Sequence, residues 1–290
     1  MLNEKELLDL ALNKRVLFMG EPIIDRYTYV KPLGRPTKDA ILSVEYVSHE
    51  DFEGGVHAAA KHAKQFCRNV DVLTGGDVYR KERFVEPSHM HKIFQTYTKL
   101  SSGGGPINYK PEDYDAVCLL DYGHSFYDNM QGLNEFTFDT KFFSVNCQTN
   151  SGNYGFNRVS KYPTSFAEYL CVDESEAMLH VGFRGASLED CLCDLRRYAT
   201  KVVITLGKKG AIGREAGKIF RCEAFTDQVT DTMGSGDAFF AITSLIAKEA
   251  DMQSLLRIGN AAGALQANIT GNKQPITKEA LLELLSKHSI

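Results

Sequence analysis

Apolar and polar positions follow two different periods along the chain, and each period marks one kind of element. The segment RVLFMG, Arg15 to Gly20, is a short continuous apolar run that ends at a glycine, as buried parallel strands do. The same character is found in YDAVCLL, FFSVN, EYLCV and KVVITLG, whereas the alanine-rich residues 54–66 and the segment LEDCLCDLRRYA predict helices. Alternation of strands and helices over most of the length predicts a mainly parallel sheet covered on both faces, a three-layer α/β/α sandwich.

Two regions interrupt this alternation with the period of antiparallel strands. They are residues 26–53, which contain RYTYV and AILSVEYV, and residues 84–106, which contain MHKIFQTYTKL and end in SSGGGP. A parallel core does not need them, so we expect them to form one small β-sheet that projects as a lid. We interpret SSGGGP as a lid turn, because the Lys-Ser/Thr pair of a phosphate-binding P-loop does not follow it. No linker or repeat divides residues 1–290, so a single domain with this lid is expected.

The C-terminal part of the chain carries clear turn and helix signals. GAIGRE and KIFRCE predict a hairpin that turns around Ala216-Gly217. Three helices are expected to close the chain, with starts near Ser235, Met252 and Thr277.

Composition narrows the class of protein. Hydrophobic residues make up 43% and charged residues 24% of the chain, and the formal net charge is −4. This balance argues against a nucleic-acid surface, and no apolar run reaches the length of a membrane span. The acidic, amphipathic N-terminus does not fit a secretory signal. Seven cysteines without a CxxC pair predict reduced thiols in a cytoplasmic protein.

One stretch, VTDTMGSGDAFFAITSLIA, carries more polar residues than a helix start needs. Asp231 and Asp237 bracket Gly234, Ser235 and Gly236 where a helix begins, although a cap requires only one such residue. Unpaired backbone N–H groups at a helix start bind anions, so the small residues suit a phosphate. A carboxylate beside a phosphate is useful when it takes a proton from a hydroxyl that attacks that phosphate. The helix N-terminus is expected to keep Asp237 ionised at neutral pH.

Asp231 to Asp237 match in full the signature D-T-x-G-[AS]-G-D, and the chain therefore resembles the ribokinase-like (PfkB-type) carbohydrate kinases. The resemblance implies a ribokinase-like fold. It also implies that Asp237 is the catalytic base and that Asp231 lies near the phosphates and the metal. The anion hole for the transferred group is implied to be formed by the backbone amides of Gly234, Ser235 and Gly236.

Further similarities concern the acceptor. GEPIIDRYTY is similar to the opening G-D-x-x-x-D-R-Y of the heptose-phosphate kinase branch, with Glu21 in place of the usual aspartate. EGGVHAAA resembles the family's G-G-x-x-N-x-A motif, with Ala58 where asparagine is expected, and DYGH resembles a segment beside the substrate phosphates. His57 is either a substrate contact or a packed or solvent-facing histidine. The candidate substrate-binding residues are Glu21, Asp25, Gly54, Gly55, His57 and Asp121.

Similarities on the nucleotide side imply that the cofactors are ATP and Mg²⁺. VDESEA lies where the family has N-x-x-E, so Glu176 and Asp173 are expected to hold Mg²⁺ indirectly, through water. VVITLGKKGA matches T-x-G-x-x-G, and NAAGALQANITGN resembles the helix that borders the adenine. The candidate nucleotide-binding residues are Thr205, Gly207, Gly210, Asp231 and Asn260.

Two weaker signals leave alternatives open. His89, His91, Lys92 and Arg83 either meet a phosphate already on the sugar or provide only surface charge. The loop 148–157 is unusually polar after a core strand, and such a loop either binds a ligand or connects elements without contacting one.

The interpretation that covers most of these signals is an ATP-dependent kinase that phosphorylates a hydroxyl of a sugar or a sugar phosphate. Two alternatives remain open, a nucleoside kinase on the same fold and a catalytically silent ligand-binding or regulatory module. The changes at Glu21, Ala58 and Asp173 favour the silent module, and Asp237 argues against it. Related kinases often pair through the lid, so a homodimer through this sheet is expected.

Overall fold

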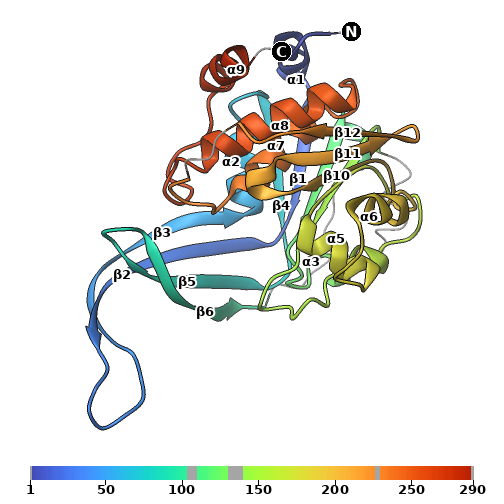
Figure 1. Ribbon diagram of the computed structural model, residues 1–290. Helices are drawn as coiled ribbons and strands as arrows, with labels where there is room; N and C mark the ends of the chain where they lie inside the picture. Colours follow the sequence, from blue (N-terminus) through green and yellow to red (C-terminus); the bar gives the residue numbers. More distant parts are fainter. Residues whose placement is uncertain (1, 103–109, 130–139, 226–228, 289–290) are drawn as a thin grey trace.

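The computed structural model describes residues 2–102, 110–129, 140–225 and 229–288, and within these ranges the larger sheet, sheet A, has eight strands (Figure 1). Their order is β12-β11-β10-β9-β8-β7-β1-β4. The pairs from β4 to β10 are parallel, and β11 and β12 are antiparallel. The strands are β1 (Arg15–Gly20), β4 (Asn69–Thr74), β7 (Ala116–Asp121), β8 (Phe143–Cys147), β9 (Ala167–Asp173), β10 (Ala199–Thr205), β11 (Ala211–Glu215) and β12 (Lys218–Cys222).

Helices cover both faces of sheet A, as the strand–helix alternation predicts (Figure 1). Phe18 and Phe240 belong to the hydrophobic cluster on one face, and Leu170 and Leu192 belong to the cluster on the other. The three-layer α/β/α arrangement is thereby confirmed. The first face carries α1 (Glu4–Ala11), α2 (Val56–Ala63), α7 (Ser235–Ile246), α8 (Met252–Gln266) and α9 (Lys278–Lys287), and the second carries α3 (Phe126–Asn129), α5 (Glu174–Val181) and α6 (Leu188–Leu195).

A separate smaller sheet, sheet B, corresponds to the expected lid. Its order is β3-β2-β5-β6, and two antiparallel hairpins join through the parallel pair β2–β5. Two strands start earlier than expected, at residues 22 and 78 instead of 26 and 84. The charged run at 80–83 conceals the second start, because both faces of β5 are partly buried. Residues 103–106 of the expected lid turn lie outside the described residues. The strands are β2 (Pro22–Gly34), β3 (Ser43–Gly55), β5 (Val78–Glu86) and β6 (His91–Ser101).

Sheet B is joined to the core by a small apolar cluster and a buried carboxylate. Tyr27 packs edge-on against Phe52 with ring centroids 5.4 Å apart, and Val85 completes the cluster. Tyr27 also donates a hydrogen bond of 2.5 Å to Asp231, and Lys92 forms an ion pair of 2.7 Å with the same carboxylate. Asp231 stands just before α7, so this joint fixes sheet B relative to the start of that helix.

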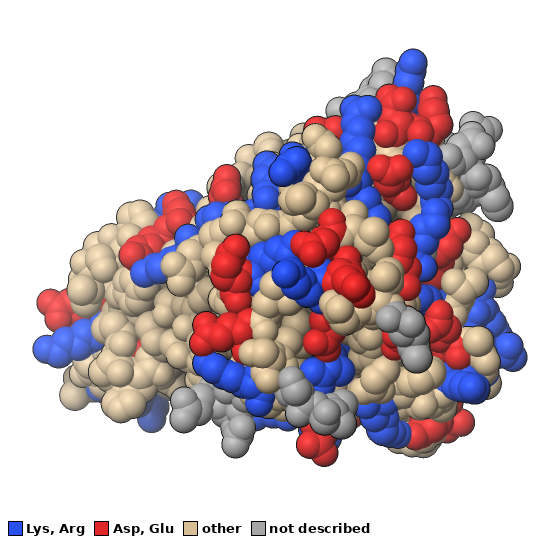
Figure 2. Space-filling model, turned by 90° about the horizontal axis from the view of Figure 1, so that it is seen from above, with Lys and Arg blue, Asp and Glu red and all other residues tan. Residues whose placement is uncertain are grey.

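The surface and the cysteines agree with the composition. Basic and acidic side chains are interspersed over the face shown in Figure 2. All seven cysteines are free thiols. Within the described ranges, each helix is too short or too polar to cross a bilayer.

The turns on either side of β11 offer a matched pair of glycines. Gly210 and Gly217 have φ values of 87° and 81°, but only Gly210 is crowded, because a β-carbon there would lie 2.1 Å from the carbonyl oxygen of Cys222. Gly217→Ala should lower the free energy of unfolding by about 1 kcal/mol, the cost of left-handed backbone. Gly210→Ala should cost about 3 kcal/mol or more, because β12 must also move. Urea unfolding measures both, and equal losses would contradict the role of crowding.

Candidate active site

Helix α7 begins without a side-chain cap, and the backbone hydrogen bond that its first residue donates, from the Ser235 N–H group to the carbonyl oxygen of Thr232, is long at 3.4 Å. Its N-cap residue, Gly234, has φ 76°, and no side chain caps the helix. A cavity of about 300 Å³ opens in front of this helix start. Seven of the candidate residues from the sequence line this cavity: Asp173, Thr205, Gly207, Gly210, Ser235, Gly236 and Asn260.

The cavity has the donors that an anionic ligand requires. The Ser235 hydroxyl oxygen is buried and has no hydrogen-bond partner among the described residues, although it belongs to the cavity lining. A β-carbon at Gly236 would meet nothing within 4 Å, so the backbone there is open to close approach. The helix start without a side-chain cap, the Ser235 hydroxyl without a partner and the open backbone at Gly236 together suit phosphate oxygens. The residues present therefore fit a nucleotide phosphate chain.

Asp237, in the first turn of α7, is held by two donors from other elements. Tyr122 donates a hydrogen bond of 2.9 Å and Gln148 one of 2.7 Å, both to Oδ1. Oδ2 accepts no hydrogen bond from the residues that the structure describes, so it can still take a proton. Burial raises the pKa of Asp237, while the two donors lower it. Burial is thus the largest influence on this carboxyl group, ahead of the helix N-terminus considered in the sequence analysis.

Sheet B contributes a charged pair near Asp237. Arg83 donates a hydrogen bond of 2.5 Å to Asp25, which is 5% exposed. Gly54 leaves room for this carboxylate, since a β-carbon there would lie 2.2 Å from Asp25 Oδ2. Gly55 joins β3 directly to α2, and His57 is half-buried on that helix. Because Arg83 is paired with the buried Asp25, it does more than add charge to the surface.

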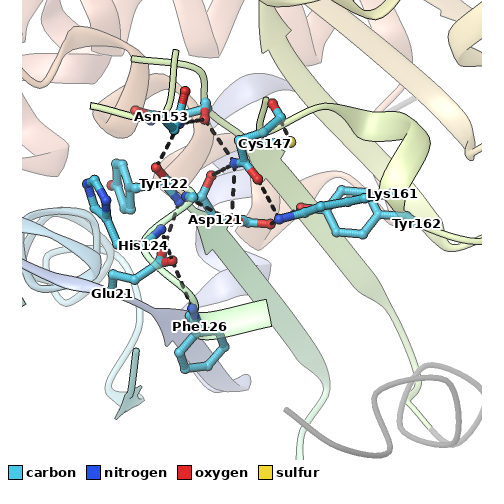
Figure 3. A network of polar contacts seen from close by, with 12 residues as sticks. Glu21, Asp121, Tyr122, His124, Phe126, Cys147, Asn153, Lys161 and Tyr162 are labelled. Atoms are coloured by element: carbon cyan, nitrogen blue, oxygen red, sulfur yellow. Dashed lines mark hydrogen bonds and ion pairs between the residues drawn. The ribbon is translucent and has the colours of Figure 1, made fainter. Parts of the chain in front are cut away.

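The structure does not place Glu21 where an acceptor can reach it, which corrects the sequence-based assignment. The side chain is fully buried and accepts hydrogen bonds from the backbone N–H groups of Tyr122, His124 and Phe126, at 3.0, 2.8 and 3.1 Å (Figure 3). Burial and the neighbouring Asp121 raise the pKa of Glu21 to about 7, although the hydrogen bonds from the three N–H groups lower it in part. Glu21 therefore shapes the segment after β7 and supports the site indirectly.

Asp121 is also buried and fully engaged, so it too is not a direct acceptor ligand. Its carboxylate is bound by Tyr162 and Lys161, which Figure 3 shows beside it, and by the amide of Asn157. The side chain that reaches Asp237 is that of the next residue, Tyr122. The resemblance of DYGH pointed to this segment, but the sequence alone did not single out the tyrosine.

Asp231 and Asn260 differ in how they relate to the cavity. Both oxygens of Asp231 are taken, by Tyr27 and Lys92 of sheet B and by the backbone N–H groups of Met233 and Gly271. Asp231 therefore belongs to the joint between sheet B and the start of α7, and it is not part of the cavity lining. Its expected place near the phosphates stays a prediction. Asn260 does line it, and its amide donates to the carbonyl oxygens of residues 222 and 223, at 2.9 and 3.1 Å.

Asp173 and Glu176 form a capping box at the start of α5. Glu176 accepts hydrogen bonds from the backbone N–H groups of Asp173 and Thr149, at 2.7 and 2.8 Å, and burial raises its pKa to about 8. Within the described ranges, no group of three or more His, Cys, Asp or Glu residues could hold a metal ion. A Mg²⁺ ion held mostly by phosphates and water fits this arrangement, because Asp173 reaches the cavity.

Comparison with known proteins agrees with these features. Residues 142–279 match the family model described as pfkB family carbohydrate kinase. A stretch of 86 residues is 31% identical to the 2-dehydro-3-deoxygalactonokinase of Haloferax volcanii, and it covers 29% of this chain and 27% of that protein. The match thus spans about a quarter of that curated relative.

Solved structures show the fold over nearly the whole chain. The Arabidopsis thaliana ribokinase complexed with ribose and ATP superposes with a TM-score of 0.67 at 13% identity, covering 94% of this chain and 99% of that one. The nucleoside kinase of Methanocaldococcus jannaschii gives a TM-score of 0.64 at 14% identity, covering 95% of this chain and 100% of that one. The fold is ribokinase-like, while the heptose-phosphate branch is not established by these comparisons.

The hydrogen bond from Tyr122 should be visible in the titration of Asp237. Tyr122→Phe removes a donor that lowers the pKa of Asp237, so that pKa should rise above its value in the parent protein. Carbon-13 NMR of labelled aspartate carboxyl groups measures it, with Asp237→Asn identifying the resonance. Tyr29→Phe, which removes a hydrogen bond to Glu50 in sheet B, is the control and should leave the resonance unmoved. An unchanged pKa in Tyr122→Phe would contradict the contact.

Proposed function

Because residues 142–279 match the pfkB carbohydrate kinase family model, we propose that the chain transfers the γ-phosphoryl group of ATP to a hydroxyl of a sugar or a sugar phosphate. The observation that carries the proposal is the position of Asp237. It stands at the uncapped start of α7, next to the residues that line the cavity, and Tyr122 and Gln148 hold it by one oxygen. This is the geometry that a base for an attacking hydroxyl requires.

Proton removal is the task of Asp237 Oδ2. The donors on Oδ1 fix the carboxylate, so Oδ2 stays available to accept the proton of the acceptor hydroxyl. Burial raises the pKa of Asp237, which makes it a stronger base than an exposed aspartate. The deprotonated acceptor oxygen then attacks the phosphorus atom, and the bond from phosphorus to the leaving oxygen breaks.

The start of α7 serves the phosphoryl group itself. Charge accumulates on the transferred group during the reaction, and we propose that the amides of Gly234, Ser235 and Gly236 stabilise it; the absence of a side-chain cap at this helix start supports the proposal. ATP with Mg²⁺ supplies the phosphoryl group and part of the charge neutralisation. Asp173 and Glu176 would hold the ion through water, while Thr205, Gly207, Gly210 and Asn260 bind the remainder of the nucleotide.

The acceptor is proposed to bind between sheet B and Asp237, with Asp25, Gly54, Gly55 and His57 as contacts. Glu21 and Asp121 support this region from beneath. The resemblance to heptose-phosphate kinases and the partial match to a 2-dehydro-3-deoxygalactonokinase both favour a carbohydrate. A nucleoside remains the second candidate acceptor, because a nucleoside kinase from Burkholderia thailandensis in complex with inosine has the same fold. The free cysteines favour a cytoplasmic location.

We also propose that two copies of the chain associate through sheet B. Several large apolar side chains are more than half exposed on the β2–β3 hairpin and its connection, and such a patch usually marks an interface. They are Leu33, Ile41, Leu42, Tyr46 and Val47.

The base can be tested by replacing one atom. Asp237→Asn keeps the shape and the hydrogen bonds of the side chain, so the fold and ATP binding should be preserved. Phosphorylation of an accepted sugar should fall by roughly 10²–10⁴-fold, the usual contribution of a positioned base. A coupled assay of ADP formation over a panel of sugars, sugar phosphates and nucleosides measures this. Asp39→Asn, an exposed aspartate in the β2–β3 connection, is the matched control. Unchanged turnover in Asp237→Asn would exclude the mechanism, and no turnover by the parent would favour a silent module.

The dimer is tested by adding charge to the apolar patch. Leu42→Lys should convert a dimer at micromolar concentration into monomers, because the ammonium would be desolvated at the interface. Sedimentation velocity measures the change. Leu10→Lys alters an equally apolar exposed residue on α1 and should leave the dimer intact. A parent protein that sediments only as a monomer at this concentration would refute the proposal.

A further inference from the structure

One lysine of sheet B is buried close to the proposed base. Lys81 lies in β5, directly opposite Asp25 of β2 and Tyr97 of β6. The residue is only 8% exposed. Its ammonium group lies 5.5 Å from the ring centre of Tyr122, the tyrosine that donates to Asp237. The charge of Lys81 is therefore placed at the junction between sheet B and the base.

This ammonium has no polar partner within the part of the chain that the structure describes. Its contacts are the faces of two aromatic rings, Tyr122 and Tyr97, the second with its centre 5.9 Å away. A buried cation without a hydrogen-bonded counter-ion is costly, and its pKa is lowered by the loss of water. A ring face offsets only part of that cost. An anion that arrives from outside would supply the missing partner.

The neighbouring carboxylates are already committed to other groups. Asp25 is paired with Arg83, and Asp237 accepts from Tyr122 and Gln148. Both carboxylates lie near Lys81, yet neither forms an ion pair with it. If Lys81 served only to neutralise Asp25 or Asp237, a direct contact would be expected. Its geometry is that of a cation kept available for a ligand.

We propose that Lys81 binds an anionic group of the acceptor, a carboxylate or a phosphate, and so selects sugar acids or sugar phosphates over neutral sugars. This inference rests on the proposed kinase function. The shared neighbour Tyr122 links the two ends of the site, because its ring faces Lys81 and its hydroxyl contacts Asp237. An acceptor whose anionic group meets Lys81 thus has its other end directed toward the base. Neutral sugars of the same skeleton lack this anchor.

The first experiment compares acceptors that share a six-carbon skeleton and carry a carboxylate, a phosphate or no anionic group. Gluconate, glucose 6-phosphate and glucose form one series, and the corresponding galactose compounds form a second. Lys81→Met should lower kcat/KM for the preferred anionic acceptor by about 10²-fold or more, the effect of removing one partner of a buried ion pair. For neutral sugars the change should be about threefold or less. The preferred member of each series shows whether the anchor is a carboxylate or a phosphate.

Lys99→Met is the matched control, because Lys99 is a lysine of β6 that pairs with Asp77 at the surface. It should leave both kinds of acceptor unaffected. Equal effects of Lys81→Met on anionic and neutral acceptors would overturn the inference while the kinase function stands. A parent protein that accepts only neutral sugars would do the same.

The second experiment does not need turnover and separates the two proposals. Binding of gluconate and glucose 6-phosphate is measured by isothermal titration calorimetry to the Asp237→Asn protein without ATP. Weakening by Lys81→Met of about 10²-fold supports the anion site, even if the parent protein phosphorylates nothing and the kinase proposal fails. If neither anionic series binds to the protein, the assignment of Lys81 is refuted.

Discussion

The carboxylate of Asp231 is the contact on which the arrangement of the site depends. It accepts two contacts from sheet B, through Tyr27 and Lys92, and two backbone hydrogen bonds, from Met233 before α7 and Gly271 after α8. A buried carboxylate is stable only while its donors stay in place. Sheet B and the start of α7 therefore keep one relative position, and the side chains of both can meet around a single acceptor.

Much of the fold follows from local patterns in the chain. The strands of the parallel sheet are nearly continuous apolar runs, because both of their faces are covered, and the turn at Ala216-Gly217 needs left-handed backbone at both residues. The starts of α7, α8 and α9 lie within a residue of their sequence signals. The sequence pattern did not predict the start of β5, because Lys81 and Arg83 are charged residues that are buried or half-buried in the folded protein. Their burial depends on partners in other elements.

In the candidate site, too, local motifs could be predicted from the sequence, whereas contacts between distant residues could not. Residues 234–237 and the T-x-G-x-x-G segment could be proposed from the sequence because each is a short local motif, and the structure brings residues of both motifs to the lining of one cavity. The roles of Glu21 and Asp121 could not be predicted, because a carboxylate at the end of a strand can face a ligand or accept hydrogen bonds from the protein itself. Glu21 is held by backbone N–H groups and Asp121 by the side chains of Asn157, Lys161 and Tyr162, and the sequence does not reveal either set of contacts. Gln148 donates to a side chain 89 positions away, so only the folded chain shows it. Local sequence patterns and secondary-structure propensities do not predict such tertiary contacts.

The parallel pairing of β2 with β5 also has a consequence for the order of folding. Each hairpin of sheet B can form alone, but the two hairpins leave the core after β1 and after β4, which are parallel neighbours in sheet A. They can meet only after α2 has returned the chain and β4 lies beside β1. Since non-local pairing forms slowly, sheet B should be completed late. Until then the exposed strand edges of both hairpins are open to mispairing with other chains.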